Sequence, residues 1–74
     1  MAYVIKVMVV DRRTGRGLPG ERVKTYGGSE TRTDSSGMAT LISNSSSVTV
    51  YVNGFRAYEG SALSAPRPIV YEKG

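Results

Sequence analysis

The chain has 74 residues, which is enough for one small domain with a modest hydrophobic core. It contains no Cys and no His, which excludes a disulfide framework, a thiolate metal site and the side chain that most often acts as a general base or metal ligand. The formal net charge is +4 at pH 7, and small domains without disulfides or metals often rely on a partner or on self-association.

Basic side chains concentrate between residues 11 and 24. This segment has five basic residues against two acidic ones, a net charge of +3, while the rest of the chain is nearly balanced. A local basic patch attracts nucleic acid or an anionic surface, but a solvated basic turn also serves only to keep a small β-protein soluble. Both interpretations stay open at this point. The basic residues of the segment are Arg12, Arg13, Arg16, Arg22 and Lys24.

The apolar N-terminal segment 3–10 does not have the pattern of a targeting signal. It lacks a basic region before it and a small-residue cleavage site after it, and Lys6 interrupts it. About 20 apolar residues are needed to cross a bilayer. We therefore expect no membrane span and a cytoplasmic location, or an exported one if the chain is a fragment of a longer exported protein.

Turn residues divide the chain into short segments rich in β-branched and aromatic residues, and no segment has a helical period. The first predicted strand is 3–10. Its odd-numbered residues are apolar and share one face, by the two-residue period of side chains in a strand. Because Lys6 interrupts the other face, we predict that the odd-numbered face lies against the core.

The turn before the second strand contains Pro19-Gly20. This pair predicts a type II turn, because Pro fixes one φ angle and Gly allows the positive φ of the next residue. In the second predicted strand, 21–26, Val23 points inward. A Gly-Gly pair then predicts a tight hairpin into a third strand, 29–33. The outward-facing residues of the second strand are Arg22, Lys24 and Tyr26.

The motif Asp34-Ser-Ser-Gly37 predicts a sharp reversal of the chain. The Asp34 carboxylate can bond to the backbone ahead of it, and Gly37 can adopt a positive φ without strain. A fourth strand, 38–43, follows this reversal. A polar loop then leads to the fifth strand, 48–52, which has the most regular alternation of apolar and polar residues in the chain.

The last third of the chain contains two further strands. Asn53-Gly54 is the strongest short hairpin signal available, and it leads to a sixth strand at 55–59. Two prolines make the segment 60–68 irregular, because Pro removes a backbone donor and restricts the residue before it. The seventh strand, 69–72, is therefore predicted at an edge or end of a sheet.

Seven short strands with closely spaced turn signals predict an all-β fold in a single domain, 1–74. We expect a β-sandwich of about seven antiparallel strands, with a small closed barrel as the alternative architecture. The predicted core consists of Ile5, Val7, Val9, Leu18, Val23, Ala39, Leu41, Val48, Val50, Val52, Phe55 and Ile69.

Three motifs follow one another along the chain. They are Asp11-x-x-Thr-Gly-x-Gly-Leu-Pro-Gly-x-x-Val23, Thr33-Asp-x-x-Gly-x-Ala-x-Leu41 and Val48-x-Val-x-x-Asn-Gly-Phe55. In this order, they resemble the carboxypeptidase regulatory-like and transthyretin-like modules. The match extends from about residue 4 to residue 58. The resemblance implies an Ig-like sandwich of about seven strands, with Leu18 in the core beside the turn and Phe55 as an inward aromatic residue.

The same resemblance implies a non-enzymatic, accessory role, in which the module supports a neighbouring domain or offers a binding surface. One branch related to transthyretin hydrolyses a purine derivative and uses histidines and a C-terminal Tyr-Arg-Gly-Ser. This chain has no His and ends in Tyr71-Glu-Lys-Gly74, so we do not expect that activity. Here the module makes up nearly the whole chain, whereas the family usually fuses it to a larger protein.

Neither catalysis nor metal binding is predicted from the residues themselves. Asp34 and Glu30 are too few carboxylates for a Ca²⁺ site, and Asp34 is typical of a turn. A serine nucleophile would need a lysine base, and neither Lys6 nor Lys24 stands in a recognisable motif. We therefore expect no enzyme activity, no metal and no cofactor.

Tyrosines next to basic residues are the candidate binding residues. They lie on predicted strand faces opposite the core, where they can stabilise the sheet by cross-strand pairing, bind a protein or a glycan, or stack the bases of single-stranded nucleic acid. The first hypothesis is a non-enzymatic binding or assembly module whose partner is another protein or a second copy. The alternative is a small basic β-domain that binds single-stranded nucleic acid, with Arg12, Arg13 and Arg16 contributing. The candidate residues on strands are Tyr26, Tyr51, Tyr58, Arg22, Lys24 and Arg56.

Overall fold

The computed structural model describes residues 2–74, and these residues form seven β-strands and no helix. The predicted all-β class is therefore confirmed, and each strand lies within two residues of its predicted range. The strands are β1 (Tyr3–Asp11), β2 (Arg22–Thr25), β3 (Glu30–Arg32), β4 (Met38–Ser43), β5 (Ser47–Val52), β6 (Phe55–Ser61) and β7 (Ile69–Lys73).

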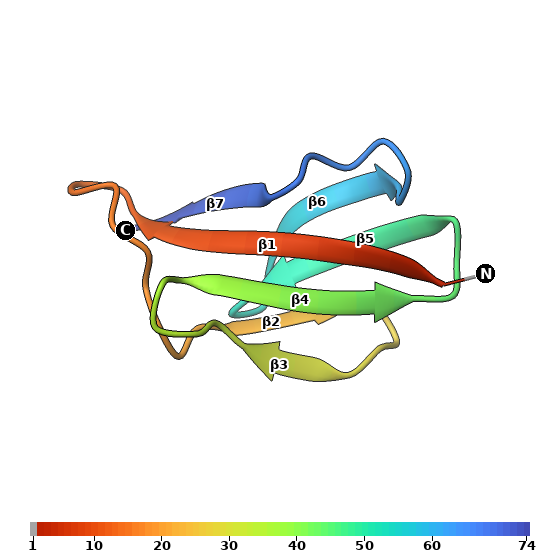
Figure 1. The fold of residues 1–74 in the computed structure, drawn as a ribbon, viewed down its shortest axis with the longest axis horizontal. Helices are drawn as coiled ribbons and strands as arrows, with labels where there is room; N and C mark the ends of the chain where they lie inside the picture. Colours follow the sequence, from red (N-terminus) through yellow and green to blue (C-terminus); the bar gives the residue numbers. More distant parts are fainter. Residues whose placement is uncertain (1) are drawn as a thin grey trace.

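The strands form two sheets that face each other across the core (Figure 1). The three-stranded sheet has the order β4-β1-β7, and the four-stranded sheet has the order β3-β2-β5-β6. The expectation that all strands are antiparallel is wrong at one place, because β7 runs parallel to β1. A parallel neighbour needs a crossover instead of a tight turn. The irregular, proline-containing segment 62–68 provides it by carrying the chain from the four-stranded sheet to the three-stranded one.

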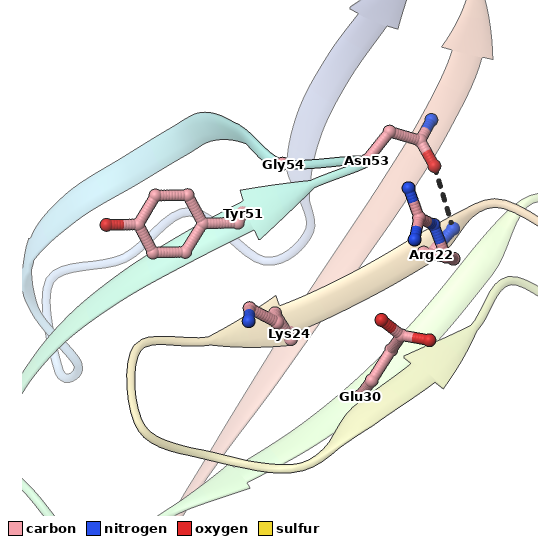
Figure 2. A pocket seen from close by; sticks show the side chains of 6 residues that line it. All are labelled: Arg22, Lys24, Glu30, Tyr51, Asn53 and Gly54. Atoms are coloured by element: carbon pink, nitrogen blue, oxygen red, sulfur yellow. Dashed lines mark hydrogen bonds between the residues drawn. The ribbon is translucent and has the colours of Figure 1, made fainter.

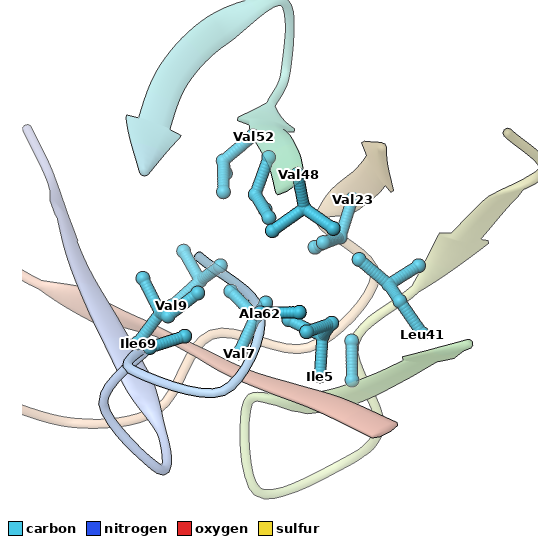
Figure 3. Close-up of a cluster of buried hydrophobic side chains, with 12 residues drawn as sticks. Ile5, Val7, Val9, Val23, Leu41, Val48, Val52, Ala62 and Ile69 are labelled. Atoms are coloured by element: carbon cyan, nitrogen blue, oxygen red, sulfur yellow. The ribbon is translucent and has the colours of Figure 1, made fainter. Parts of the chain in front are cut away.

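The core lies between the sheets and follows the predicted alternation in β1, β4 and β5 (Figure 3). Fully buried valines and Ile5 line both sheets. Two alanines of the crossover segment, Ala62 and Ala65, are also buried, although the sequence pattern did not assign them to the core. The residues of the cluster are Ile5, Val7, Val9, Val23, Ala39, Leu41, Val48, Val50, Val52, Ala62, Ala65 and Ile69.

Two residues of the predicted core differ in the structure. Leu18 is half-buried and packs against the edge of the core cluster. Phe55 is 66% exposed, so its assignment as an inward aromatic residue is wrong. It begins β6 directly after the hairpin turn, and β6 is an edge strand whose only neighbour in the sheet is β5. The end of an edge strand leaves a large side chain open to solvent.

The turns have the backbone geometry that their residues predict. Gly20, after Pro19, has a φ of 73°, as a type II turn requires. Asn53 and Gly54 have φ angles of 52° and 88°, the two positive values of a type I′ hairpin. In the reversal that ends at Gly37, the Asp34 Oδ1 atom accepts hydrogen bonds from the backbone nitrogens of Ser36 at 2.9 Å and Met38 at 3.0 Å.

Two loops cross in direct backbone contact at Gly17 and Gly37. A Cβ atom built on Gly37 would lie 2.6 Å from the Gly17 Cα atom and 2.7 Å from both the Leu18 nitrogen and the Val9 oxygen. Hydrogen bonds hold this crossing to β1: the Val9 nitrogen donates to the Gly37 oxygen at 2.9 Å, and the Leu18 nitrogen donates to the Val9 oxygen at 2.8 Å. No side chain fits between these backbones.

The crossing gives a stability prediction that separates steric contact from backbone strain. Gly15 and Gly37 both have a positive φ, but a Cβ atom on Gly15 meets nothing within 4 Å. Gly15→Ala should therefore cost about 1 kcal/mol from strain alone, whereas Gly37→Ala should cost about 3 kcal/mol because overpacking adds to the strain. Urea unfolding measures both free energies, and equal losses would contradict the close approach.

Candidate binding surface

The outward-facing side chains of the four-stranded sheet form rows across the strands, because the register sets which residues stand opposite one another. One row contains Glu30 of β3, Lys24 of β2, Tyr51 of β5 and Arg56 of β6. Cross-strand neighbours on one face are close enough to interact. Tyr51 therefore stands between two cationic residues, and a cation beside an aromatic ring is attracted to its face.

A second row lies beside the first and contains two opposed arginines, Arg22 of β2 and Arg32 of β3. The Arg32 Nη1 atom donates to the Gly20 carbonyl oxygen at 2.9 Å, which ties that side chain to the turn before β2. The backbone nitrogen of Arg22 donates to the Asn53 Oδ1 atom at 3.2 Å. This bond anchors the start of β2 to the turn between β5 and β6.

A shallow cavity of about 110 Å³ lies where the two rows meet (Figure 2). Two cations, one carboxylate and one phenol line this cavity, so it is suited to a polar ligand group. Tyr26 extends the surface at the other end of β2, where it is 80% exposed. The cavity is lined by Arg22, Lys24, Glu30, Tyr51, Asn53 and Gly54.

Five of the predicted site residues thus lie on the same side of the four-stranded sheet. We refer to this group as the basic tyrosine face, and it consists of Arg22, Lys24, Tyr26, Tyr51 and Arg56.

The charges of the basic tyrosine face are only partly neutralised within the protein. Arg56 forms an ion pair with Glu59 at 3.2 Å, in which both side chains are exposed, and such a pair contributes little to stability. Within residues 2–74, no carboxylate lies at ion-pair distance from Arg22 or Lys24. These two cations are therefore available to an external anionic group.

Tyr58 is not part of the basic tyrosine face, although the alternation predicted it there. The register pairs Tyr51 with Arg56 but Val50 with Tyr58, so Ala57 is the extra residue of a β-bulge. A bulge moves all following side chains of the strand to the opposite face. Tyr58 consequently packs against the core cluster, and its hydroxyl donates to the Ser61 carbonyl oxygen at 2.8 Å.

Arg12, Arg13 and Arg16 lie on the loop after β1, near the C-terminus and outside the four-stranded sheet that carries the basic tyrosine face (Figure 1). Asp11 organises this loop: its Oδ1 atom accepts hydrogen bonds from the Arg13 nitrogen at 2.7 Å and the Thr14 nitrogen at 3.2 Å. The three arginine side chains are exposed. The basic segment of the sequence is thus divided between this loop and β2.

The carboxylate of Glu21, which no motif of the sequence marks, connects the two sheets. The Glu21 Oε1 atom accepts a hydrogen bond from Lys73 Nζ, at the end of β7, at 2.7 Å and another from Asn53 Nδ2 at 2.9 Å. The bond from Lys73, followed by that from Asn53, holds the pKa of Glu21 below its usual value. No local pattern indicates this cluster, because its three members are far apart in the chain.

Asp34 is the second carboxyl group with a lowered pKa. The largest cause is the hydrogen bond from the Met38 backbone nitrogen, followed by the bond from the Ser36 side chain.

Within residues 2–74, no group of three or more acidic side chains is arranged to hold a metal ion. In the same residues, no helix is long and apolar enough to span a membrane.

Comparisons with protein-family models, with curated proteins and with solved structures find no match to this chain.

Acidification should destabilise the fold through Glu21 and Asp34. Both groups have a folded-state pKa below that of the unfolded chain, so their stabilisation is complete above the unfolded pKa and is lost as the pH falls through the folded pKa. We expect the melting temperature to decrease below about pH 5, and to decrease less in Glu21→Gln. Thermal melts across this pH range measure both, and equal decreases would contradict the contribution of Glu21.

Proposed function

We propose that the protein is a non-enzymatic binding module whose basic tyrosine face binds an acidic surface of a partner protein. The observation that supports this most directly is the row in which Tyr51 stands between Lys24 and Arg56. Tyrosine and arginine are enriched at protein interfaces, because they combine a large contact area with directed hydrogen bonds. Arg22 adds a cation that has no ion-pair partner within residues 2–74.

We also propose that the two sheets form an Ig-like, transthyretin-like sandwich. The three motifs of the resemblance and the division into three and four strands support this assignment. In such modules the sandwich is a rigid support for a binding surface. This agrees with a site made of strand residues, whose positions the register sets.

The charge balance of the basic tyrosine face favours a protein over a nucleic acid. Glu30 lies in the same row as Lys24, and Glu59 forms an ion pair with Arg56. Carboxylates at these places would repel a phosphate backbone that runs along the face. A protein partner can meet such a mixed surface with donors as well as with carboxylates, since charge complementarity sets specificity at interfaces.

Affinity capture with the immobilised protein tests this proposal. Wild type should retain a discrete protein partner, and Lys24→Glu combined with Arg56→Glu should abolish its retention because both cations beside Tyr51 are reversed. The matched control is Arg12→Glu combined with Arg13→Glu, which makes the same charge change on the loop after β1, outside the row that contains Tyr51, and should leave retention unchanged. Equal loss in both double variants would show that only net charge matters and would contradict the assigned face.

Once a partner is available, Tyr51→Ala should weaken binding by about 2 kcal/mol, the loss typical of a central aromatic residue at an interface. Isothermal titration calorimetry measures this loss. Tyr26→Ala is the comparison, because Tyr26 lies at the end of the face and should contribute less.

A single-stranded nucleic acid is the second candidate ligand. One observation favours it: an aromatic ring flanked by two cations in one row is the arrangement that stacks a base and neutralises its phosphates. Its affinity should fall steeply as salt is added, because bound phosphates release counterions. If a labelled single-stranded DNA oligonucleotide shows no binding at low salt, this candidate is eliminated, whereas salt-sensitive binding that Tyr51→Ala weakens would favour it over a protein partner.

A further inference from the structure

The outward-facing residues of the three-stranded sheet are mostly apolar. Along β1, the side chains that turn away from the core include Val4 and Met8. The register places Ile42 opposite Val4, and both Met38 and Val70 opposite Met8. We refer to these five residues, Val4, Met8, Met38, Ile42 and Val70, as the apolar face.

Three of the five residues of the apolar face are exposed in the single chain, and Met8 and Met38 are half-buried. Val4 is 45% exposed, Val70 is 56% exposed and Ile42 is 68% exposed. These residues are three of the six exposed large hydrophobic side chains in the described part of the chain, and they lie on adjacent strands of one sheet. The row of Lys6 and Thr40 lies between the row of Val4 and Ile42 and the row of Met8, Met38 and Val70. Apolar side chains gathered on one face mark interaction sites more often than scattered ones do.

Two charged side chains lie on this face and bracket its centre. Lys6 lies on β1 two residues before Met8, and Glu72 lies on β7 two residues after Val70. Lys6 Nζ donates to Thr40 Oγ1 at 3.1 Å. Neither Lys6 nor Glu72 forms an ion pair with any of residues 2–74. The apolar centre therefore has an unpaired cation on one side and an unpaired anion on the other.

This distribution of charge is complementary to itself. Met8 and Val70 stand side by side on β1 and β7, and Lys6 and Glu72 lie on opposite sides of the midpoint between them. A two-fold axis that lies in the plane of the face, passes through this midpoint and runs obliquely across the strands exchanges the positions of Lys6 and Glu72. In two copies related by such an axis, each Lys6 meets the Glu72 of the other copy, and the two methionines and Val70 meet at the centre. Interfaces with two-fold symmetry require this kind of self-complementarity.

We propose that two copies of the chain pack through their apolar faces, with Lys6 of each copy paired to Glu72 of the other. The proposal is independent of the proposed function, because the basic tyrosine face lies on the other sheet and stays exposed in the pair. Val4 and Ile42 lie at the rim of this contact, on the side of Lys6 away from the axis. A chain with no disulfide and a small core gains buried apolar area by this pairing.

Analytical ultracentrifugation over a range of concentrations tests the proposal. The wild-type sedimentation coefficient should rise with concentration towards that of a dimer. Val70→Lys, which places a charge at the centre of the contact, should sediment as a monomer. The matched control is Leu63→Lys: Leu63 is 70% exposed in the crossover segment, outside the apolar face, and its replacement should leave the dimer unchanged. Thermal melts show whether each variant is folded.

A charge exchange tests the pairing itself. Lys6→Glu and Glu72→Lys should each weaken dimerisation about tenfold, because each change sets like charges opposite one another at two equivalent places. The combination of Lys6→Glu with Glu72→Lys should restore dimerisation to within about twofold of wild type, the range expected for an exposed pair with its partners exchanged.

Three results would overturn the proposal. If the wild-type chain stays monomeric at every concentration, two copies do not associate through the apolar face, and its occupant must be a different protein. A dimer that persists in folded Val70→Lys would place the contact elsewhere on the chain. A double exchange that fails to restore what the single changes remove would exclude the Lys6–Glu72 pairing.

Discussion

The crossing of two backbones at Gly17 and Gly37 is the contact on which the rest of the fold depends. The loop between β1 and β2 and the reversal between β3 and β4 touch here without intervening side chains, and both are hydrogen-bonded to Val9 near the end of β1. Since β1 and β4 belong to one sheet and β2 and β3 to the other, this contact sets how the sheets meet. This backbone contact thus joins two distant segments of the chain, as a disulfide often does in other small proteins.

Thr33 extends this contact to the start of β2. Its hydroxyl donates to the Leu18 carbonyl oxygen and accepts from the Glu21 nitrogen, and its own backbone bonds to Gly20 and Glu21. A buried threonine with all its polar groups bonded is a stable anchor. It holds Glu21 where the carboxylate reaches Lys73, and it determines where the outward side chains of β2 begin. The basic tyrosine face is therefore positioned from the end of the sheets at which β2 begins.

The two outer surfaces of the molecule differ in chemistry, and the difference follows from strand alternation. On the four-stranded sheet, outward positions include Arg, Lys, Tyr, Glu and Thr side chains, a mixed polar surface that offers directed contacts. On the three-stranded sheet, outward positions are mostly apolar, and Lys6 is the only charge on β1 before Asp11. The mixed polar surface suits a transient partner, whereas the mostly apolar surface is stabilised most by a permanent interface.

Local chemistry by itself determined the seven strands, the positive φ angles of the turns and the inward faces of β1, β4 and β5, because alternation and turn preferences act over a few residues. It also indicated the cations and Tyr51 of the basic tyrosine face. Only the tertiary structure decided the bulge at Ala57, which turned Tyr58 inward, the exposure of Phe55 on an edge strand, and the parallel pairing of β7. It also decided the meeting of Glu21 with Lys73. These features depend on which strands become neighbours, and that is set by contacts between segments far apart in the chain.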